Sequence, residues 1–292
     1  MDELNFLQPK TLAEAKALIR EDTKWKLLAG GTDLVLNIRK SNETNNYTLS
    51  LGKILELKTI EESEGKVIIG AMVTFNDLIE SKVIKSNYNS LLKSSLTMGS
   101  PQIRNVATIG GNIVNAGSAA DAIPCIISLE GVLVIESLEE TRCISCEDYF
   151  KRYHEEKVKP NEILTKIILP KKKCNSGYYK LSKRNSLAIA RLSAALTISV
   201  EEDKIKSLNI CLGAVGKYPF RAKELEEQGL NKQVNWLYSE EASKLLSDVV
   251  EKSIGGRKTM PFKREAIKGV FKEALTITLD KQHSLGKGGD LS

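Results

Sequence analysis

The chain has 292 residues, of which 41% are hydrophobic, 27% charged and 5% aromatic, with a formal net charge of +6. This length suits two domains that can each bury a core. The basic residues alternate with acidic ones and lack the aromatic neighbours that a base-stacking groove needs, and no apolar run is long enough to cross a bilayer, so we expect neither a nucleic acid partner nor a membrane span.

The first elements predicted are a helix, a strand and a second helix. Thr11 and Glu14 form a capping box at the start of an amphipathic helix. The apolar run at residues 25–30 ends in glycine and predicts a buried strand. Thr32 and Asp33 follow as candidate N-caps of the next helix.

The next stretch again begins with a strand followed by a short helix, and its pattern then becomes irregular. Residues 66–72 predict a strand, and Thr74 with Asp77 opens a short helix. Residues 91–98 look helical, whereas residues 101–117 are rich in glycine and asparagine and predict looped or extended chain. Asp121 is then a candidate cap for an apolar helix, followed by a strand at residues 131–137.

The second half of the chain contains a predicted domain boundary. The apolar segments 162–170 and 177–184 are expected to form a hairpin, and the turn between them separates residues 1–173 from residues 174–285. The second part then shows two strands joined by a charged turn at 201–206. Three helices follow, near 221–228, 239–254 and 261–277, and residues 286–292 are a tail. Strands followed by helices predict a small α+β domain.

Cysteine and histidine usage limits the chemistry. The five cysteines are an odd number, and the N-terminus shows no signal-peptide pattern, so we expect a cytoplasmic protein with reduced thiols. Cys143 and Cys146 form a C-x-x-C without a second pair at metal-site spacing, and ordinary buried or half-buried thiols are the favoured interpretation. The two histidines, His154 and His283, make a catalytic triad or a histidine-ligated metal centre improbable. We expect no metal site and no side chain acting as an obligatory acid or base.

Two glycine doublets, Gly30–Gly31 and Gly110–Gly111, are the most informative feature. Each follows an apolar stretch and precedes a small polar residue, Thr32 or Asn112. Glycine tolerates positive φ, so consecutive N–H groups can turn towards one anion. Ordinary turns are the alternative, and neither doublet has Rossmann or P-loop spacing. The residues alone therefore indicate a bound phosphorylated cofactor.

Longer strings carry a resemblance to a known family. LLAGGTDLVLNIRK and SPQIRNVATIGGNIVNAGSAADAIP resemble the two FAD-binding signatures of the flavoprotein subunits of molybdenum hydroxylases, which include the medium subunits of xanthine, carbon monoxide and nicotinate dehydrogenases. LGAVGKYPFRAKELE and MPFKREAIKGVFKEAL resemble that family's C-terminal domain. The resemblance implies an α+β fold, with a two-part PCMH-type, vanillyl-alcohol-oxidase-like FAD-binding domain followed by a small α+β C-terminal domain.

The resemblance also assigns cofactor-binding positions. Two loops are implied to hold the FAD diphosphate through backbone amides, and Asp121, also a candidate helix cap, to contact the cofactor. Leu164 and Lys180 match positions near the flavin, with a core leucine and a surface lysine as the alternatives. Met98 stands where some relatives place an aromatic residue. The implied FAD-binding residues are Leu27, Leu28, Ala29, Gly30, Gly31, Thr32, Asp33, Leu34, Met98, Thr108, Ile109, Gly110, Gly111, Asn112, Asp121, Leu164 and Lys180.

Two departures from the family pattern are visible. The stretch at residues 115–118 lacks a proline that relatives commonly have, so this loop is expected to be more mobile. The cysteine-rich insert of the 4-hydroxybenzoyl-CoA reductases is absent, which disfavours that branch.

The family resemblance implies an electron-transfer role. The flavin would receive electrons from [2Fe–2S] centres of a neighbouring subunit, reduced in turn by a molybdopterin subunit, and would pass a pair to NAD+ or another acceptor. Xanthine is the first expectation for the hydroxylated substrate, and nicotinate or a similar N-heterocycle is the second. A stand-alone FAD-dependent oxidase or reductase and a non-enzymatic nucleotide-binding or nucleic-acid-binding protein are the alternatives.

Overall fold

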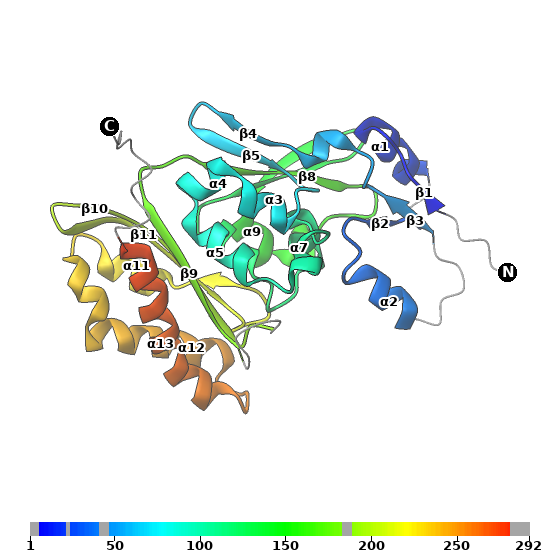
Figure 1. The fold of residues 1–292 in the computed structure, drawn as a ribbon. Helices are drawn as coiled ribbons and strands as arrows, with labels where there is room; N and C mark the ends of the chain where they lie inside the picture. Colours follow the sequence, from blue (N-terminus) through cyan, green and yellow to red (C-terminus); the bar gives the residue numbers. More distant parts are fainter. Residues whose placement is uncertain (1–5, 22–23, 41–46, 183–188, 281–292) are drawn as a thin grey trace.

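The computed structural model describes residues 6–21, 24–40, 47–182 and 189–280. These residues form three β-sheets surrounded by helices, each sheet beside its own hydrophobic cluster (Figure 1). The expected α+β class is therefore confirmed. His283 and the predicted tail at 286–292 lie outside the described residues.

The first sheet is small and parallel, in the order β1-β3-β2. Glu14 N–H donates to Thr11 Oγ1 at 3.2 Å, but the Glu14 carboxylate accepts from Lys10 N–H and so reaches one residue further back than a standard capping box. The β2 strand is half-buried and not buried as predicted, because it lies at an edge of the sheet. The elements are β1 (Phe6–Leu7), α1 (Leu12–Glu21), β2 (Lys26–Leu28), α2 (Leu34–Lys40) and β3 (Thr48–Ser50).

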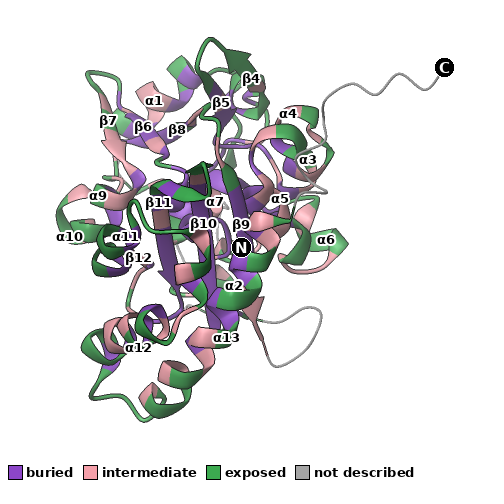
Figure 2. Ribbon diagram, turned by 90° about the vertical axis from the view of Figure 1, so that its left-hand side faces the viewer, coloured by how far each residue is buried: buried purple, intermediate pink, exposed green. Residues whose placement is uncertain are grey.

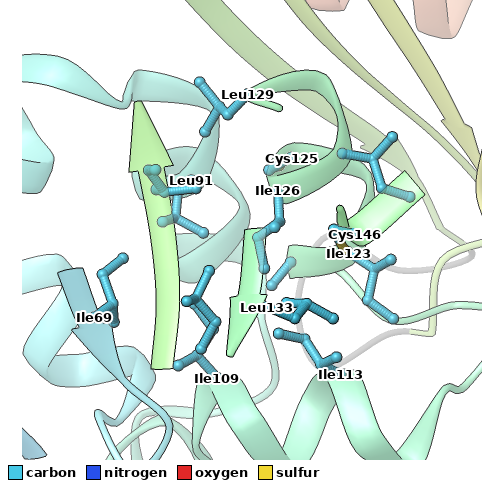
Figure 3. Close-up of a cluster of buried hydrophobic side chains, with 14 of the residues drawn as sticks. Ile69, Leu91, Ile109, Ile113, Ile123, Cys125, Ile126, Leu129, Leu133 and Cys146 are labelled. Atoms are coloured by element: carbon cyan, nitrogen blue, oxygen red, sulfur yellow. The ribbon is translucent and has the colours of Figure 1, made fainter. Parts of the chain in front are cut away.

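The second sheet has the order β4-β5-β8-β6-β7 and is antiparallel throughout. Helix α8 is buried along its whole length between this sheet and the third one, and its side chains Ile123, Cys125 and Ile126 belong to the cluster drawn in Figure 3. The strands are β4 (Ile60–Ser63), β5 (Lys66–Gly70), β6 (Val132–Glu136), β7 (Thr141–Ser145) and β8 (Ile163–Pro170). The helices are η1 (Leu55–Lys58), α3 (Phe75–Glu80), α4 (Lys82–Asn87), α5 (Asn89–Thr97), α6 (Pro101–Arg104), α7 (Ile109–Asn115), α8 (Ala122–Ser128), α9 (Cys146–Lys151) and α10 (Tyr153–Glu156).

The prediction of a loop at residues 101–117 is wrong. Ser100 and Thr108 accept hydrogen bonds from Ile103 N–H and Gly111 N–H, and so they cap α6 and α7. Such caps satisfy amides that a helix start otherwise leaves unpaired. The burial of apolar side chains on α7 adds to this, so that capping and burial together outweigh the low helix propensity of the glycines.

The predicted hairpin between β8 and the following strand is also wrong. Both edges of β8 are occupied, by β5 and β6. The chain therefore leaves this sheet, and β9 (Asn175–Leu181) pairs with β10 in a third sheet. The division into residues 1–173 and 174–285 stays a prediction.

The third sheet, in the order β12-β11-β10-β9, carries three helices and a 3-10 turn. The predicted charged turn joins β10 to β11, with positive φ at Glu202 and Asp203. Helices α12 and α13 turn buried residues inwards and exposed ones outwards (Figure 2). The elements are β10 (Leu192–Glu201), β11 (Lys204–Gly213), β12 (Phe220–Arg221), α11 (Lys223–Gly229), η2 (Val234–Tyr238), α12 (Glu240–Ile254) and α13 (Met260–Leu279).

Two glycine-to-alanine substitutions should have opposite effects on stability. A Cβ atom on Gly177 of β9 would lie 2.7 Å from the backbone oxygen of Ala274 in α13, whereas one on Gly269, exposed on the same helix, would meet nothing within 4 Å. We expect Gly177→Ala to lower the free energy of unfolding by about 1–3 kcal/mol and Gly269→Ala to raise it by about 0.5–1 kcal/mol. Urea unfolding followed by circular dichroism measures both, and equal shifts would contradict the packing described.

Candidate functional site

A cavity of about 310 Å³ lies where the first sheet meets α7 and β8. It brings together both glycine doublets with the methionine and the β8 leucine that the sequence singled out. The predicted site residues that line it are Leu27, Ala29, Gly30, Gly31, Thr32, Asp33, Leu34, Met98, Thr108, Gly110, Gly111, Asn112 and Leu164.

The first doublet is held tightly against the loop before α7. A Cβ atom on Gly30 would lie 2.0 Å from the Val106 carbonyl oxygen and 2.9 Å from the Ala107 Cα atom. Its neighbour Gly31 has φ +73, a conformation that side chains disfavour. Both positions therefore require glycine, one for the close approach and the other for the backbone turn.

The backbone that follows β2 presents free hydrogen-bond donors. Within the described part of the chain, no acceptor is present for the N–H groups of Gly30, Gly31, Thr32 and Asp33. Gly30, Gly31 and Thr32 are half-buried, whereas Asp33 is exposed. Half-buried amides usually have partners, so three free ones in a row are unusual. A bound anion would provide the missing acceptors.

The second doublet does not present its amides as the sequence predicted. Gly110 N–H donates to the Ala71 carbonyl at 2.9 Å, and Gly111 N–H donates to Thr108 Oγ1 at 3.0 Å. Neither of these two glycines has positive φ, because both lie in the first turn of α7. Their small size instead allows close packing, since a Cβ atom on Gly110 would lie 2.6 Å from the Ala71 oxygen.

Asn112 is an unpaired polar side chain in the wall of the cavity. Its Oδ1 atom is buried and has no hydrogen-bond partner in the described residues. An unsatisfied amide oxygen of this kind costs about 1–3 kcal/mol. A ligand that donates a hydrogen bond here would remove that cost.

Asp121 and Lys180 do not line the cavity. The Lys180 Nζ atom lies 3.0 Å from Asp121 Oδ2, and the Tyr178 hydroxyl donates to Asp121 Oδ1 at 2.8 Å. Burial raises the pKa of Asp121, and the positive charge of Lys180 opposes that rise. Asp121 makes no helix-cap hydrogen bond, and Lys180 is not a surface residue because its side chain is only 7% exposed.

The predicted site residues therefore separate into those that line the cavity and those that do not. Leu28 in β2 and the fully buried Ile109 also fall outside the cavity lining. Sequence reasoning missed nine lining residues. Some flank the predicted ones in sequence or, like Asn37, lie one helical turn from one, whereas Leu51, Ala71, Met72 and Val158 come from segments that carried no predicted site residue. These missed residues are Asn37, Leu51, Ala71, Met72, Ala107, Val114, Asn115, Val158 and Ile163.

The other cysteine, histidine and acidic residues that the structure describes form no metal centre. Among the described residues, no group of three or more His, Cys, Asp or Glu side chains is placed to hold a metal ion. The expectation of buried or half-buried thiols is wrong for Cys143, which is exposed, whereas Cys146 is buried and its burial raises the pKa of the thiol. No helix of the described residues is long and apolar enough to span a membrane.

Comparison with protein families gives two matches that together span most of the chain. Residues 2–172 match the model described as the FAD binding domain in molybdopterin dehydrogenase. Residues 177–278 match the CO dehydrogenase flavoprotein C-terminal domain.

Individual relatives agree with this result. The chain is 32% identical to the nicotinate dehydrogenase FAD-subunit of Eubacterium barkeri, over 96% of this chain and 98% of that one. It is 26% identical to the xanthine dehydrogenase FAD-binding subunit of Escherichia coli O157:H7, over 94% and 96%. Its fold is similar to a chain of reconstituted CO dehydrogenase from Oligotropha carboxidovorans, with a TM-score of 0.86 and 25% identity, over 94% and 97%.

The buried pair of Asp121 and Lys180 makes a testable contribution to stability. Asp121→Asn leaves the Lys180 charge buried without a counter-ion and should lower the free energy of unfolding by about 3–5 kcal/mol. Adding Lys180→Met to that variant should restore most of the loss. Glu139→Gln, which breaks the exposed pair with Arg20, is the matched control and should change stability by less than about 1 kcal/mol. Urea unfolding provides the values, and a double variant as unstable as the single one would rule out this account.

Proposed function

This chain belongs to the FAD-binding subunits of the molybdenum hydroxylase family, and we propose that its cavity seats the FAD of an electron-transfer subunit in such a complex. The observation that carries the proposal is the meeting of both glycine doublets in one cavity, with four free amides in the segment from Gly30 to Asp33. The FAD diphosphate has the acceptors that these amides lack.

The residues of the cavity have separate roles in this proposal. The amides of Gly30, Gly31, Thr32 and Asp33 bind the diphosphate, while the second doublet lets α7 pack close beside them. Asn112 Oδ1 accepts a hydrogen bond from a cofactor hydroxyl or N–H group.

Apolar side chains complete the site. Met98 and Leu164 lie against the ring system and exclude water, with the Met98 thioether in place of an aromatic ring. The bound FAD supplies the redox chemistry, taking electrons from [2Fe–2S] centres and passing them on. No side chain of the cavity wall is required as an acid or base.

The Asp121 and Lys180 pair has an indirect role in this proposal. It joins α8, which follows the second signature, to β9 of the third sheet. By fixing the distance between these elements it positions the wall of the site. Leu28 and Ile109 likewise support the two loops from behind.

The proposal also includes partner subunits and an electron acceptor. We infer a heteromeric, cytoplasmic complex with a [2Fe–2S] subunit and a molybdopterin subunit that hydroxylates an aromatic N-heterocycle. Similarity to the nicotinate and xanthine dehydrogenase subunits supports this substrate class, and the higher identity favours nicotinate over the xanthine first expected. NAD+ is the proposed electron acceptor. A stand-alone FAD-dependent oxidase or reductase is the second candidate.

Isolation of the complex from its native host tests this function. The tagged chain should co-purify with FAD, iron and molybdenum, and nicotinate or xanthine should bleach the flavin absorbance under anaerobic conditions. Reoxidation by NAD+ would support the acceptor. A chain that carries FAD and turns over a donor without iron or molybdenum would support the stand-alone enzyme instead.

A substitution at Gly30 tests the cofactor site in the isolated chain. Gly30→Ala pushes the first doublet away from Val106 and should lower the FAD content per chain at least tenfold, because it moves the free amides. Gly117→Ala is the matched control, since a Cβ atom there meets nothing within 4 Å, and should keep its FAD. Flavin absorbance after gel filtration measures both. Full FAD retention by Gly30→Ala would place the diphosphate elsewhere.

A further inference from the structure

The irregular segment between α10 and β8 supplies one wall of the cavity. It spans residues 157–162 and contributes Val158 to the lining, and the strand that follows contributes Ile163 and Leu164. In the proposed function, Leu164 lies against the ring system of the cofactor. The position of this segment therefore decides how closely the wall meets the flavin.

The β-ladder holds the start of β8 incompletely. The pairing of β8 with β5 ends at Lys166, so Ile163 and Leu164 pair only with β6. The pairing with β6 shifts its register between Leu164 and Lys166, which leaves Thr165 without an opposite residue, as in a β-bulge. A bulge disrupts the ladder locally and bends the strand. The position of Leu164 therefore depends on contacts outside the ladder as well.

The Arg142 guanidinium, on β7, makes such contacts. Its Nε and Nη2 atoms each donate to the Glu162 carboxylate at 2.9 Å, which is the two-pronged pairing that arginine forms with carboxylates. Its Nη1 atom donates to the Glu156 carboxylate at 3.0 Å, and Nη2 also donates to the Glu156 carbonyl at 2.9 Å. One side chain thus holds both ends of the segment, the last residue of α10 and the residue before β8.

The Glu162 carboxylate also fixes the turn within the segment. Its Oε2 atom accepts a hydrogen bond from Lys159 N–H at 2.9 Å, and Glu162 N–H donates to the Lys159 carbonyl at 3.0 Å. Burial by itself would raise the pKa of Glu162, whose side chain is only 9% exposed, but the hydrogen bonds from Arg142 lower it overall. The carboxylate is therefore charged at neutral pH, and the pair with Arg142 is fully formed.

We propose that Arg142 is a positioning residue for the flavin, because through Glu162 it fixes the cavity wall formed by Val158 and Leu164. This inference rests on the proposed function and gives a role within it to a side chain that does not line the cavity. The planar guanidinium is essential to this role. A lysine ammonium carries the same charge but lacks the fork that binds both carboxylate oxygens at once.

Substitutions at Arg142 test the proposal in the full-length, FAD-loaded chain. Arg142→Gln and, separately, Arg142→Lys should each raise the Kd for FAD by roughly tenfold, because the wall of the site is no longer held in place. At saturating FAD, the absorbance spectrum of the bound flavin should move from that of the wild-type protein towards that of FAD in water. Fluorescence titration and absorbance spectroscopy measure the two effects, and circular dichroism checks that each variant is folded.

Arg152→Gln is the matched control. Arg152 also pairs with Glu156, at 2.9 Å, but its side chain is 50% exposed and no ion pair joins it to Glu162 in the described residues. This variant should keep the wild-type Kd and spectrum. If Arg142→Gln does not fold, the comparison of Arg142→Lys with this control decides.

Several results would overturn the proposal. Both Arg142 variants could keep the wild-type Kd and spectrum, or Arg142→Lys could restore both values, which would show that the charge matters and the position does not. The wild-type spectrum could already equal that of FAD in water, so that no wall meets the ring system. In these cases the chain still binds FAD and the proposed function stands. A wild-type chain that binds no FAD would contradict the proposed function itself.

Discussion

The close approach of Gly30 to Val106 and Ala107 is the constraint on which the site depends. It joins the end of β2, in the small parallel sheet, to the loop before α7, which packs beside the second sheet. Two parts of the chain separated by more than seventy positions thereby form one cavity. Since the contact is backbone to backbone, it leaves no room for a side chain and brings the free amides beside α7.

Polar contacts at the two ends of α8 attach the third sheet to the rest of the structure. Asp121 in front of α8 pairs with Lys180 on β9, and the side-chain amide of Asn209 donates to the Ser128 carbonyl at the other end of α8. Helix α8 lies between these contacts, with every residue buried. Both contacts require a fixed alignment of donor and acceptor, so they set the position of the sheet more specifically than apolar packing alone.

Sequence patterns predicted the elements well where local chemistry decides them. The capping box at Thr74 and Asp77 forms as expected, as does the charged turn after β10. The helices at residues 101–117 were missed because glycine signals loops, and only the caps at Ser100 and Thr108 with tertiary burial reverse that tendency. The false hairpin arose because pairing partners far apart in sequence, β5 and β6, occupy both edges of β8.

For the site, too, the sequence predicts the location better than the contacts of single atoms. The glycine doublets predicted where the cavity lies, but the sequence does not show which amides are free, because that depends on acceptors such as the Ala71 carbonyl and Thr108 Oγ1. The first doublet therefore offers hydrogen bonds, and the second provides room. A site built in this way needs few reactive side chains, which agrees with a cofactor that brings its own chemistry.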